Sequence, residues 1–155
     1  MVEQFFHVCP DRRSITGFSM GGHGALMLAA KLPNWYRSVT SISPISRPLS
    51  CDRFCKRSFE AFFGSYEGGK DFSLVDYLNA KGSQLRLPPG FVDVASKDEL
   101  ADFLQWPLLI ETLRKNGHLD FPVTYHEGYD HSYCFVSTII EKHIDFHASH
   151  LLDHP

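Results

Sequence analysis

Short runs of β-branched and other hydrophobic residues alternate along the chain with longer stretches whose hydrophobic residues recur at helical spacing. The short runs occupy residues 13–16, 38–43, 91–95 and 121–125. The helical spacing covers residues 24–31, 102–116 and 133–151, while residues 44–89 show no clear periodicity. Short strands that alternate with helices predict an α/β fold, in which helices cover a parallel sheet.

The composition is that of a folded domain. Of the 155 residues, 43% are hydrophobic and 21% are charged, which excludes a coiled coil and a largely disordered chain. The net charge of −3 leaves no basic excess for binding a nucleic-acid backbone or an anionic membrane. No stretch approaches the roughly 18 hydrophobic residues of a membrane span, and the first ten residues lack the basic cluster of a signal peptide. We therefore expect a cytoplasmic protein.

A G-x-S-x-G motif at residues 17–21 lies between the first predicted strand and the first predicted helix. This is the context of a nucleophile elbow, a sharp turn that exposes a serine hydroxyl, so Ser19 is the predicted nucleophile. We expect Gly17 and Gly21 to remove Cβ atoms that would clash in the turn, and Gly22 and Gly24 to let the helix approach the sheet. The alternative is a glycine-rich helix start with an incidental serine.

The same turn predicts where negative charge would be stabilised. The Met20 N–H, at the start of the helix, is expected to donate to the oxyanion that forms above Ser19. In α/β-hydrolases a second donor comes from a loop that precedes the elbow. We expect this loop and the N-terminal strands to be absent, because the chain begins just before the elbow strand.

A serine nucleophile needs a base, and the base needs a carboxylate that orients it. In α/β-hydrolases these residues follow in the order Ser, Asp or Glu, His. Asp98 follows the third predicted strand and His131 follows the fourth, so both belong to loops at the carboxyl ends of parallel strands. Asp98 is the predicted acid, with Glu99 as its nearest competitor, and His131 is the predicted base.

Two other groups of residues suggest a metal site. His143, His147 and His150 share the last predicted helix, but no carboxylate or cysteine set completes a site, and we interpret them as a partly exposed helix face. Cys51 and Cys55 lie four residues apart without a second pair at zinc-finger spacing, so we expect free thiols in a surface loop. The sequence therefore predicts no metal site.

Four segments are similar to the S-formylglutathione hydrolase family, also called the esterase D family. They read GFSMGGHGAL (17–26), SISPI (41–45), GSQL (82–85) and EGYDHSY (127–133), and the similarity extends over essentially the whole chain. The resemblance implies a partial α/β-hydrolase fold over residues 1–155, a single domain of about four parallel strands with flanking helices. It also implies that Ser19, Asp98 and His131 are the catalytic serine, acid and histidine.

The resemblance implies hydrolysis of S-formylglutathione to glutathione and formate, the hydrolytic step of formaldehyde detoxification, with carboxylesterase activity besides. It implies a small-molecule thioester substrate and no metal or organic cofactor, and it leaves a homodimer open. The loop around Asp98 departs from the family pattern, because Ala95 and Leu100 stand where the family has Gly and Phe. Two alternatives stay open: a catalytically silent fragment, and an esterase of the same superfamily with another acyl substrate.

Overall fold

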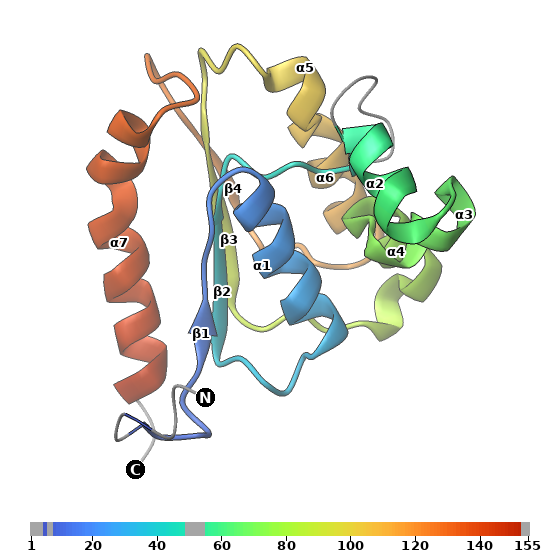
Figure 1. The fold of residues 1–155 in the computed structure, drawn as a ribbon. Helices are drawn as coiled ribbons and strands as arrows, with labels where there is room; N and C mark the ends of the chain where they lie inside the picture. Colours follow the sequence, from blue (N-terminus) through green and yellow to red (C-terminus); the bar gives the residue numbers. More distant parts are fainter. Residues whose placement is uncertain (1–4, 6–7, 49–54, 153–155) are drawn as a thin grey trace.

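The computed structural model describes residues 5, 8–48 and 55–152, without the side chains of residues 55, 56, 59 and 66. Its centre is a parallel sheet with the strand order β1-β2-β3-β4 (Figure 1). The strands are β1 (Ser14–Ile15), β2 (Ser38–Ile42), β3 (Gly90–Ala95) and β4 (Val123–His126). Each expected strand is present, so the predicted parallel α/β arrangement is confirmed.

Helices cover both faces of this sheet (Figure 1). Helix α7 (Tyr133–Leu152) lies alone on one face, and the other described helices lie on the opposite side. These are α1 (Met20–Lys31), α2 (Cys55–Phe63), α3 (Tyr66–Gly69), η3 (Lys70–Phe72), α4 (Leu74–Lys81), η4 (Gly82–Gln84), α5 (Ala101–Leu104) and α6 (Trp106–Lys115). Five of these elements, α2 to η4, fall in the region where the sequence shows no clear periodicity.

The single helix predicted for residues 102–116 is wrong, because the structure divides it into α5 and α6. Gln105 separates them in a left-handed conformation with φ 56°. Pro107 follows in the first turn of α6, where its missing N–H is tolerated, and its ring prevents one continuous helix across the junction. Hydrophobic spacing continues through the break, so periodicity alone does not reveal it.

Two hydrophobic clusters separate the layers. The larger one joins β2 and β3 to α1, α4 and α6, and includes Leu26, Val39, Val92 and Leu109, all at most 2% exposed. The smaller one lies between the carboxyl ends of the strands and the start of α7, and its buried members are Ile42, Ala95, Phe135 and Ile139. The start of α7 is therefore anchored where β2 and β3 end.

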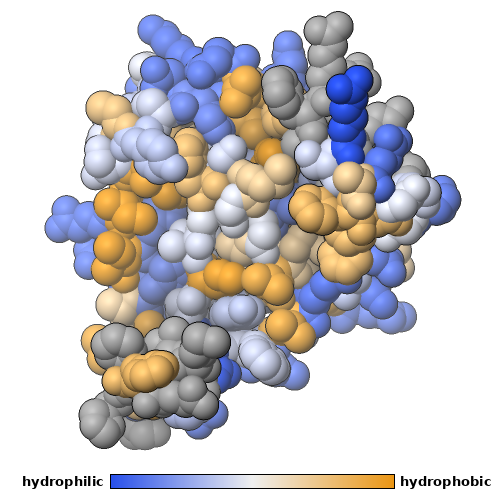
Figure 2. Space-filling model, viewed as in Figure 1, coloured by the Kyte–Doolittle hydropathy of each residue, from blue (hydrophilic) through white to orange (hydrophobic). Residues whose placement is uncertain are grey.

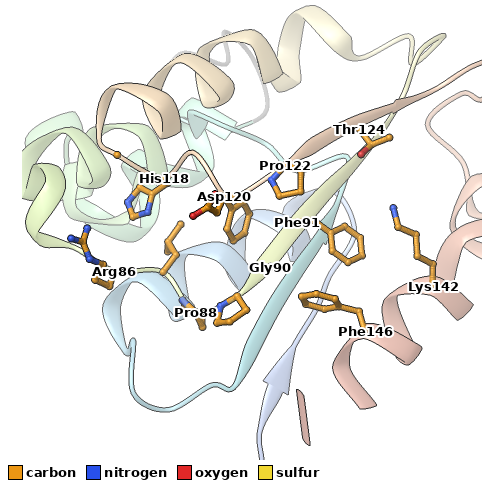
Figure 3. A pocket seen from close by; sticks show the side chains of 14 residues that line it. Arg86, Pro88, Gly90, Phe91, His118, Asp120, Pro122, Thr124, Lys142 and Phe146 are labelled. Atoms are coloured by element: carbon orange, nitrogen blue, oxygen red, sulfur yellow. The ribbon is translucent and has the colours of Figure 1, made fainter. Parts of the chain in front are cut away.

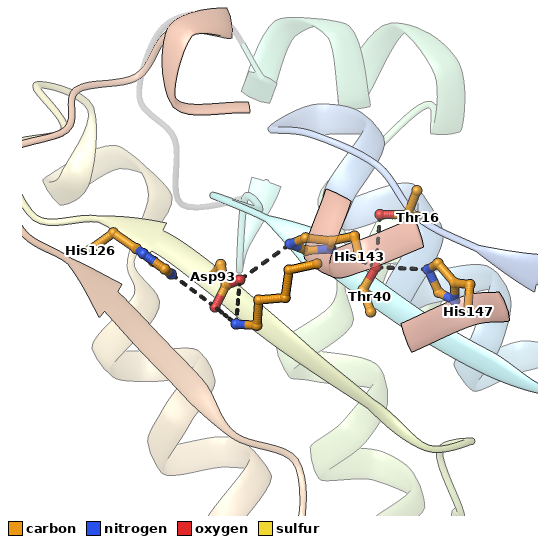
Figure 4. A network of polar contacts seen from close by, with 7 residues as sticks. Thr16, Thr40, Asp93, His126, His143 and His147 are labelled. Atoms are coloured by element: carbon orange, nitrogen blue, oxygen red, sulfur yellow. Dashed lines mark hydrogen bonds and ion pairs between the residues drawn. The ribbon is translucent and has the colours of Figure 1, made fainter. Parts of the chain in front are cut away.

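Polar side chains occupy the rest of the interface between α7 and the sheet (Figure 4). The Thr40 Oγ1 lies 2.8 Å from His143 Nδ1 and 2.8 Å from His147 Nε2, and Asp93 accepts hydrogen bonds of 2.8 and 3.0 Å from Lys142 Nζ. His143 is fully buried and His147 is 8% exposed, so the expectation of a partly exposed face is wrong for these two, whereas His150 is partly exposed. The two buried rings contact hydroxyl groups of the sheet, and His143 Nε2 also lies 3.3 Å from Asp93 Oδ2.

The described residues contain neither a metal-binding group nor a membrane-spanning helix. Among the residues that the structure describes, no group of histidine, cysteine and carboxylate side chains could hold a metal ion. Cys51 lies outside the described residues, as does the side chain of Cys55. None of the described helices is long and hydrophobic enough to cross a membrane. The face seen in Figure 2 mixes hydrophobic and hydrophilic side chains.

Candidate active site

Ser19 occupies a strained turn between β1 and α1. Its backbone has φ 56° and ψ −116°, a combination that costs a residue with a side chain about 1–3 kcal/mol. Hydrogen bonds to the next strand hold the turn in place: the Ser19 N–H donates to the Ile42 carbonyl at 2.9 Å, and the Ile42 N–H donates to the Gly17 carbonyl at 2.9 Å. The strain therefore persists because both sides of the elbow are paired with the end of β2.

Two of the four glycines around the elbow are required by packing. A Cβ atom on Gly17 would lie 2.2 Å from the Gly21 carbonyl oxygen, and one on Gly22 would lie 2.5 Å from Ser41 Oγ. The expectation is wrong for the other two, because a Cβ atom on Gly21 or Gly24 would meet nothing within 4 Å. The turn thus needs Gly17, and the contact between α1 and β2 needs Gly22.

Three side chains from three loops meet above the carboxyl ends of the strands. The Ser19 Oγ lies 2.9 Å from His131 Nε2, and His131 Nδ1 lies 2.6 Å from Asp98 Oδ2. The Asp98 side chain is fully buried and the His131 side chain is 10% exposed. The structure therefore brings the predicted serine, base and acid into one hydrogen-bonded line at the edge of the sheet.

Asp98, rather than its neighbour, contacts the imidazole. The second Asp98 oxygen, Oδ1, accepts a hydrogen bond of 2.9 Å from the Leu100 N–H, which fixes the carboxylate plane. The Glu99 Oε2 instead accepts a bond of 3.3 Å from the backbone N–H of His131. Glu99 thus binds the main chain of the histidine loop, the segment 127–132 between β4 and α7, whereas Asp98 binds the ring of His131.

Ser96 joins the acid loop, the segment 96–100 that carries Asp98, to the histidine loop. No motif in the sequence reveals this role. Its Oγ donates a bond of 2.7 Å to Glu127 and accepts one of 3.0 Å from the Gly128 N–H. Its backbone N–H donates to the His126 carbonyl at 2.9 Å. A short polar residue directly after β3 is the available sequence signal, but its partners become evident only once β3 and β4 are paired.

An aromatic side chain covers one face of the imidazole. The Phe18 ring is stacked on the His131 ring with centroids 4.6 Å apart and planes inclined by 29°. Tyr133, at the start of α7, lies on Phe18 at 5.5 Å and is 79% exposed. In the G-x-S-x-G motif Phe18 is only the variable residue before the serine, so the motif does not predict this contact.

The Met20 N–H is available at the start of α1. It donates no hydrogen bond to any residue in the described part of the chain. The free N–H groups of a helix start carry partial positive charge, and this one belongs to the residue that follows Ser19. Together, a hydroxyl, a base with its orienting carboxylate and a free donor are what nucleophilic attack on a carbonyl needs.

A cleft of about 770 Å³ lies elsewhere in the molecule (Figure 3). It opens beside Gly90, where β3 begins, and its lining includes Phe91, His118 and Phe146. Ser19, Asp98 and His131 lie beyond the other end of the strands and do not line it. The cleft and the hydrogen-bonded line are therefore separate features.

The chain is similar to known proteins along nearly its whole length. A family model described as a putative esterase matches residues 1–146. An S-formylglutathione hydrolase of Bos taurus is 35% identical over 154 residues, which are 97% of this chain and 53% of that protein. The chain thus spans about half the length of this relative.

The fold is also similar to that of solved S-formylglutathione hydrolases. The S-formylglutathione hydrolase of Agrobacterium tumefaciens superimposes with a TM-score of 0.86 at 30% identity, covering 97% of this chain and 53% of that one. The enzyme of that name from Staphylococcus aureus gives a TM-score of 0.69 at 20% identity over 94% of this chain and 59% of that one, a likeness of fold alone. The predicted α/β-hydrolase arrangement is thereby confirmed.

Proposed function

Because the chain belongs to the putative esterase family, we propose that the protein is a serine hydrolase that cleaves S-formylglutathione to glutathione and formate. One observation carries the proposal: the hydrogen-bonded line from Ser19 through His131 to Asp98, at a strained elbow. The similarity to S-formylglutathione hydrolases supports the choice of substrate. We further propose that the reaction belongs to formaldehyde breakdown in the cytoplasm.

In the first step Ser19 Oγ attacks the thioester carbonyl while His131 Nε2 takes its proton. Asp98 accepts a hydrogen bond from Nδ1–H, which leaves Nε2 free to act as the base and stabilises the imidazolium that forms. The Met20 N–H donates to the carbonyl oxygen as it becomes negatively charged. These three residues and one backbone N–H therefore have distinct roles in acylation.

The second half of the reaction releases both products. The carbon–sulfur bond breaks, glutathione departs, and the proton held by His131 passes to its sulfur. A thiol with a pKa of about 8.5 is a good leaving group, so this step depends less on proton donation than the loss of an alcohol would. His131 then takes a proton from water, whose oxygen attacks the formyl-Ser19 ester. The bond between the formyl carbon and Ser19 Oγ breaks, His131 returns the proton to Oγ, and formate is released.

Labelling and turnover test the proposal together. We expect a fluorophosphonate probe to modify the protein at Ser19, and S-formylglutathione to be hydrolysed faster than a simple aryl acetate. The Ser19→Ala variant is the control, and both signals should vanish in it. Absence of label on correctly folded protein contradicts a serine hydrolase. Labelled protein that hydrolyses aryl acetates but not S-formylglutathione contradicts the substrate and supports another acyl group.

A further inference from the structure

Phe18 is the one described aromatic side chain stacked on the ring of His131. The two centroids are 4.6 Å apart and the planes are inclined by 29°, so the rings overlap face to face. The Phe18 backbone is held by an isolated bridge to Ile42, and its side chain packs on the small hydrophobic cluster under α7. The backbone of Phe18 is therefore part of the sheet edge, and its ring packs between this edge and His131.

The contacts of His131 explain why such a ring matters. Its two nitrogens are bound in the ring plane, Nε2 to Ser19 and Nδ1 to Asp98. These two hydrogen bonds and the Cβ–Cγ bond hold the ring at its edge and leave its faces without support, so small rotations of the side chain can still tilt it. A flat surface against one face limits this tilt, and Phe18 provides it.

Stacking also responds to the charge of the imidazole. The face of a benzene ring carries negative potential and attracts a cation within about 6 Å of its centre. During attack by Ser19 the neutral imidazole becomes an imidazolium, so this attraction grows as the transition state forms. A contact that strengthens along the reaction raises the rate rather than the affinity for substrate.

We propose that Phe18 is a positioning residue that sets the tilt of His131 and stabilises its imidazolium form. This inference rests on the proposed hydrolase function and adds a fourth side chain to the three predicted from the sequence. Tyr133 contacts Phe18 at 5.5 Å from the solvent side, so it supports the ring of Phe18.

The charged groups around His131 stay the same when Phe18 is replaced. Asp98 binds the ring, Glu99 binds its backbone N–H, and Lys97 donates its own N–H to the Tyr129 carbonyl of the same loop. Asp130 accepts a hydrogen bond from Ser132. The first turns of α1 and α7 carry no acidic residue. A change in pH dependence on replacing Phe18 is therefore assigned to the ring itself.

The test is the pH dependence of kcat/KM in Phe18→Leu and Phe18→Tyr, compared with the unchanged protein. For Phe18→Leu we expect the acidic midpoint to fall by about half a pH unit and kcat to fall about threefold to tenfold, with KM unchanged. Phe18→Tyr, which retains the aromatic face, should keep the original midpoint. Phe146→Leu is the matched control, because it removes an aromatic ring beside His150 near the far end of α7 and should leave the midpoint in place.

A second variant separates charge from packing. Replacing Phe18 by a trifluorinated phenylalanine keeps the shape of the ring while weakening the negative potential of its face, so the midpoint should again fall. An unchanged midpoint in both Phe18→Leu and the fluorinated protein overturns the inference, even if activity is lower. Absence of Ser19-dependent turnover in the unchanged protein instead contradicts the proposed function, so the two failures are distinguishable.

Discussion

Two clusters in this molecule combine a hydroxyl, a histidine and a carboxylate, and both follow the same order along the chain. In the candidate active site they are Ser19, Asp98 and His131. Beneath α7 they are Thr40, Asp93 and His143: the hydroxyl lies 2.8 Å from Nδ1, and the carboxylate lies 3.3 Å from Nε2. Residue types and chain order therefore do not by themselves distinguish a reactive site from a structural one.

Access distinguishes the two clusters. Thr40, Asp93 and His143 are all fully buried, whereas Ser19 is partly exposed on a strained turn. Thr40 Oγ1 has three partners, since it also contacts Thr16 and His147, so its single proton is committed to the network. No carbonyl substrate can reach this hydroxyl, and no free N–H of a helix start lies next to it in sequence.

The two carboxylates also differ in the number of groups that they bind. Burial by itself raises the pKa of Asp93, but contacts with His143, Lys142 and His126 outweigh it and lower the pKa to about 2. Asp93 is therefore ionised and shared among groups from α7 and β4 (Figure 4). The carboxylate beneath α7 joins the helix to the sheet, and that of Asp98 is directed at one imidazole.

The largest expected difference between the clusters comes from removing each hydroxyl. Ser19→Ala should reduce kcat by about 10⁶-fold, because attack, proton transfer and acylation fail together. Thr40→Ala, the matched change beneath α7, should keep turnover and fluorophosphonate labelling in the folded protein. Turnover of S-formylglutathione by both variants measures this, and a Thr40→Ala protein that is folded but unlabelled would contradict the distinction.

Replacing each carboxylate by an amide should have different effects: one variant should lose activity and the other should lose stability. Asp98→Asn should lower kcat by about 10⁴-fold with little effect on unfolding, because the amide no longer stabilises the required tautomer and imidazolium. Asp93→Asn should instead lower the free energy of unfolding by about 2 kcal/mol, because the hydrogen bonds to the half-exposed Lys142 lose the strength that the charged carboxylate gives them. Urea denaturation and turnover of both variants check this, and equal effects of the two on kcat would contradict it.

The pH dependence of stability should report the cluster beneath α7. Burial, followed by the neighbouring imidazoles of His143 and His150, lowers the pKa of His147 from its ordinary value of 6.5 to about 4. The unfolded chain therefore binds a proton between pH 6.5 and pH 4 that the folded chain does not. Stability is complete above pH 6.5 and should fall by up to about 3 kcal/mol as the pH drops to 4.

Urea denaturation at several pH values between 4 and 8 measures this loss. His147→Gln is the control, since it retains hydrogen-bonding capacity without a titrating ring, and its stability should vary less over the same range. An equally steep pH dependence in this variant would assign the loss to other groups.

The smallest expected effect concerns the link between the two loops of the candidate site. Ser96→Ala removes the bonds to Glu127 and to the Gly128 N–H, so His131 should be held less firmly. A hydrogen bond contributes about 1 kcal/mol, and we expect kcat to fall about fivefold with KM unchanged. Steady-state kinetics measures this, with Ser149→Ala, which loses a bond on the far end of α7, as the control.

The local features can be inferred from the order of residues alone. The strand, the serine and the following helix are adjacent in the chain, so Ser19 and the need for Gly17 can be inferred from one short motif. Asp98 and His131 can be inferred as well, because chain order and the ends of parallel strands restrict the candidates. Their alignment with Ser19, however, follows from the pairing of β2 with β3 and of β3 with β4.

The contacts between distant segments cannot be inferred in this way, because they arise when the chain folds. The stacking of Phe18 on His131, the bonds of Ser96 and the burial of His143 and His147 all depend on which elements become neighbours and in which register. Hydrophobic periodicity says that a helix face is covered, but it does not say what covers it. A histidine therefore looks the same in the sequence whether it meets a threonine in the core or a serine at the edge.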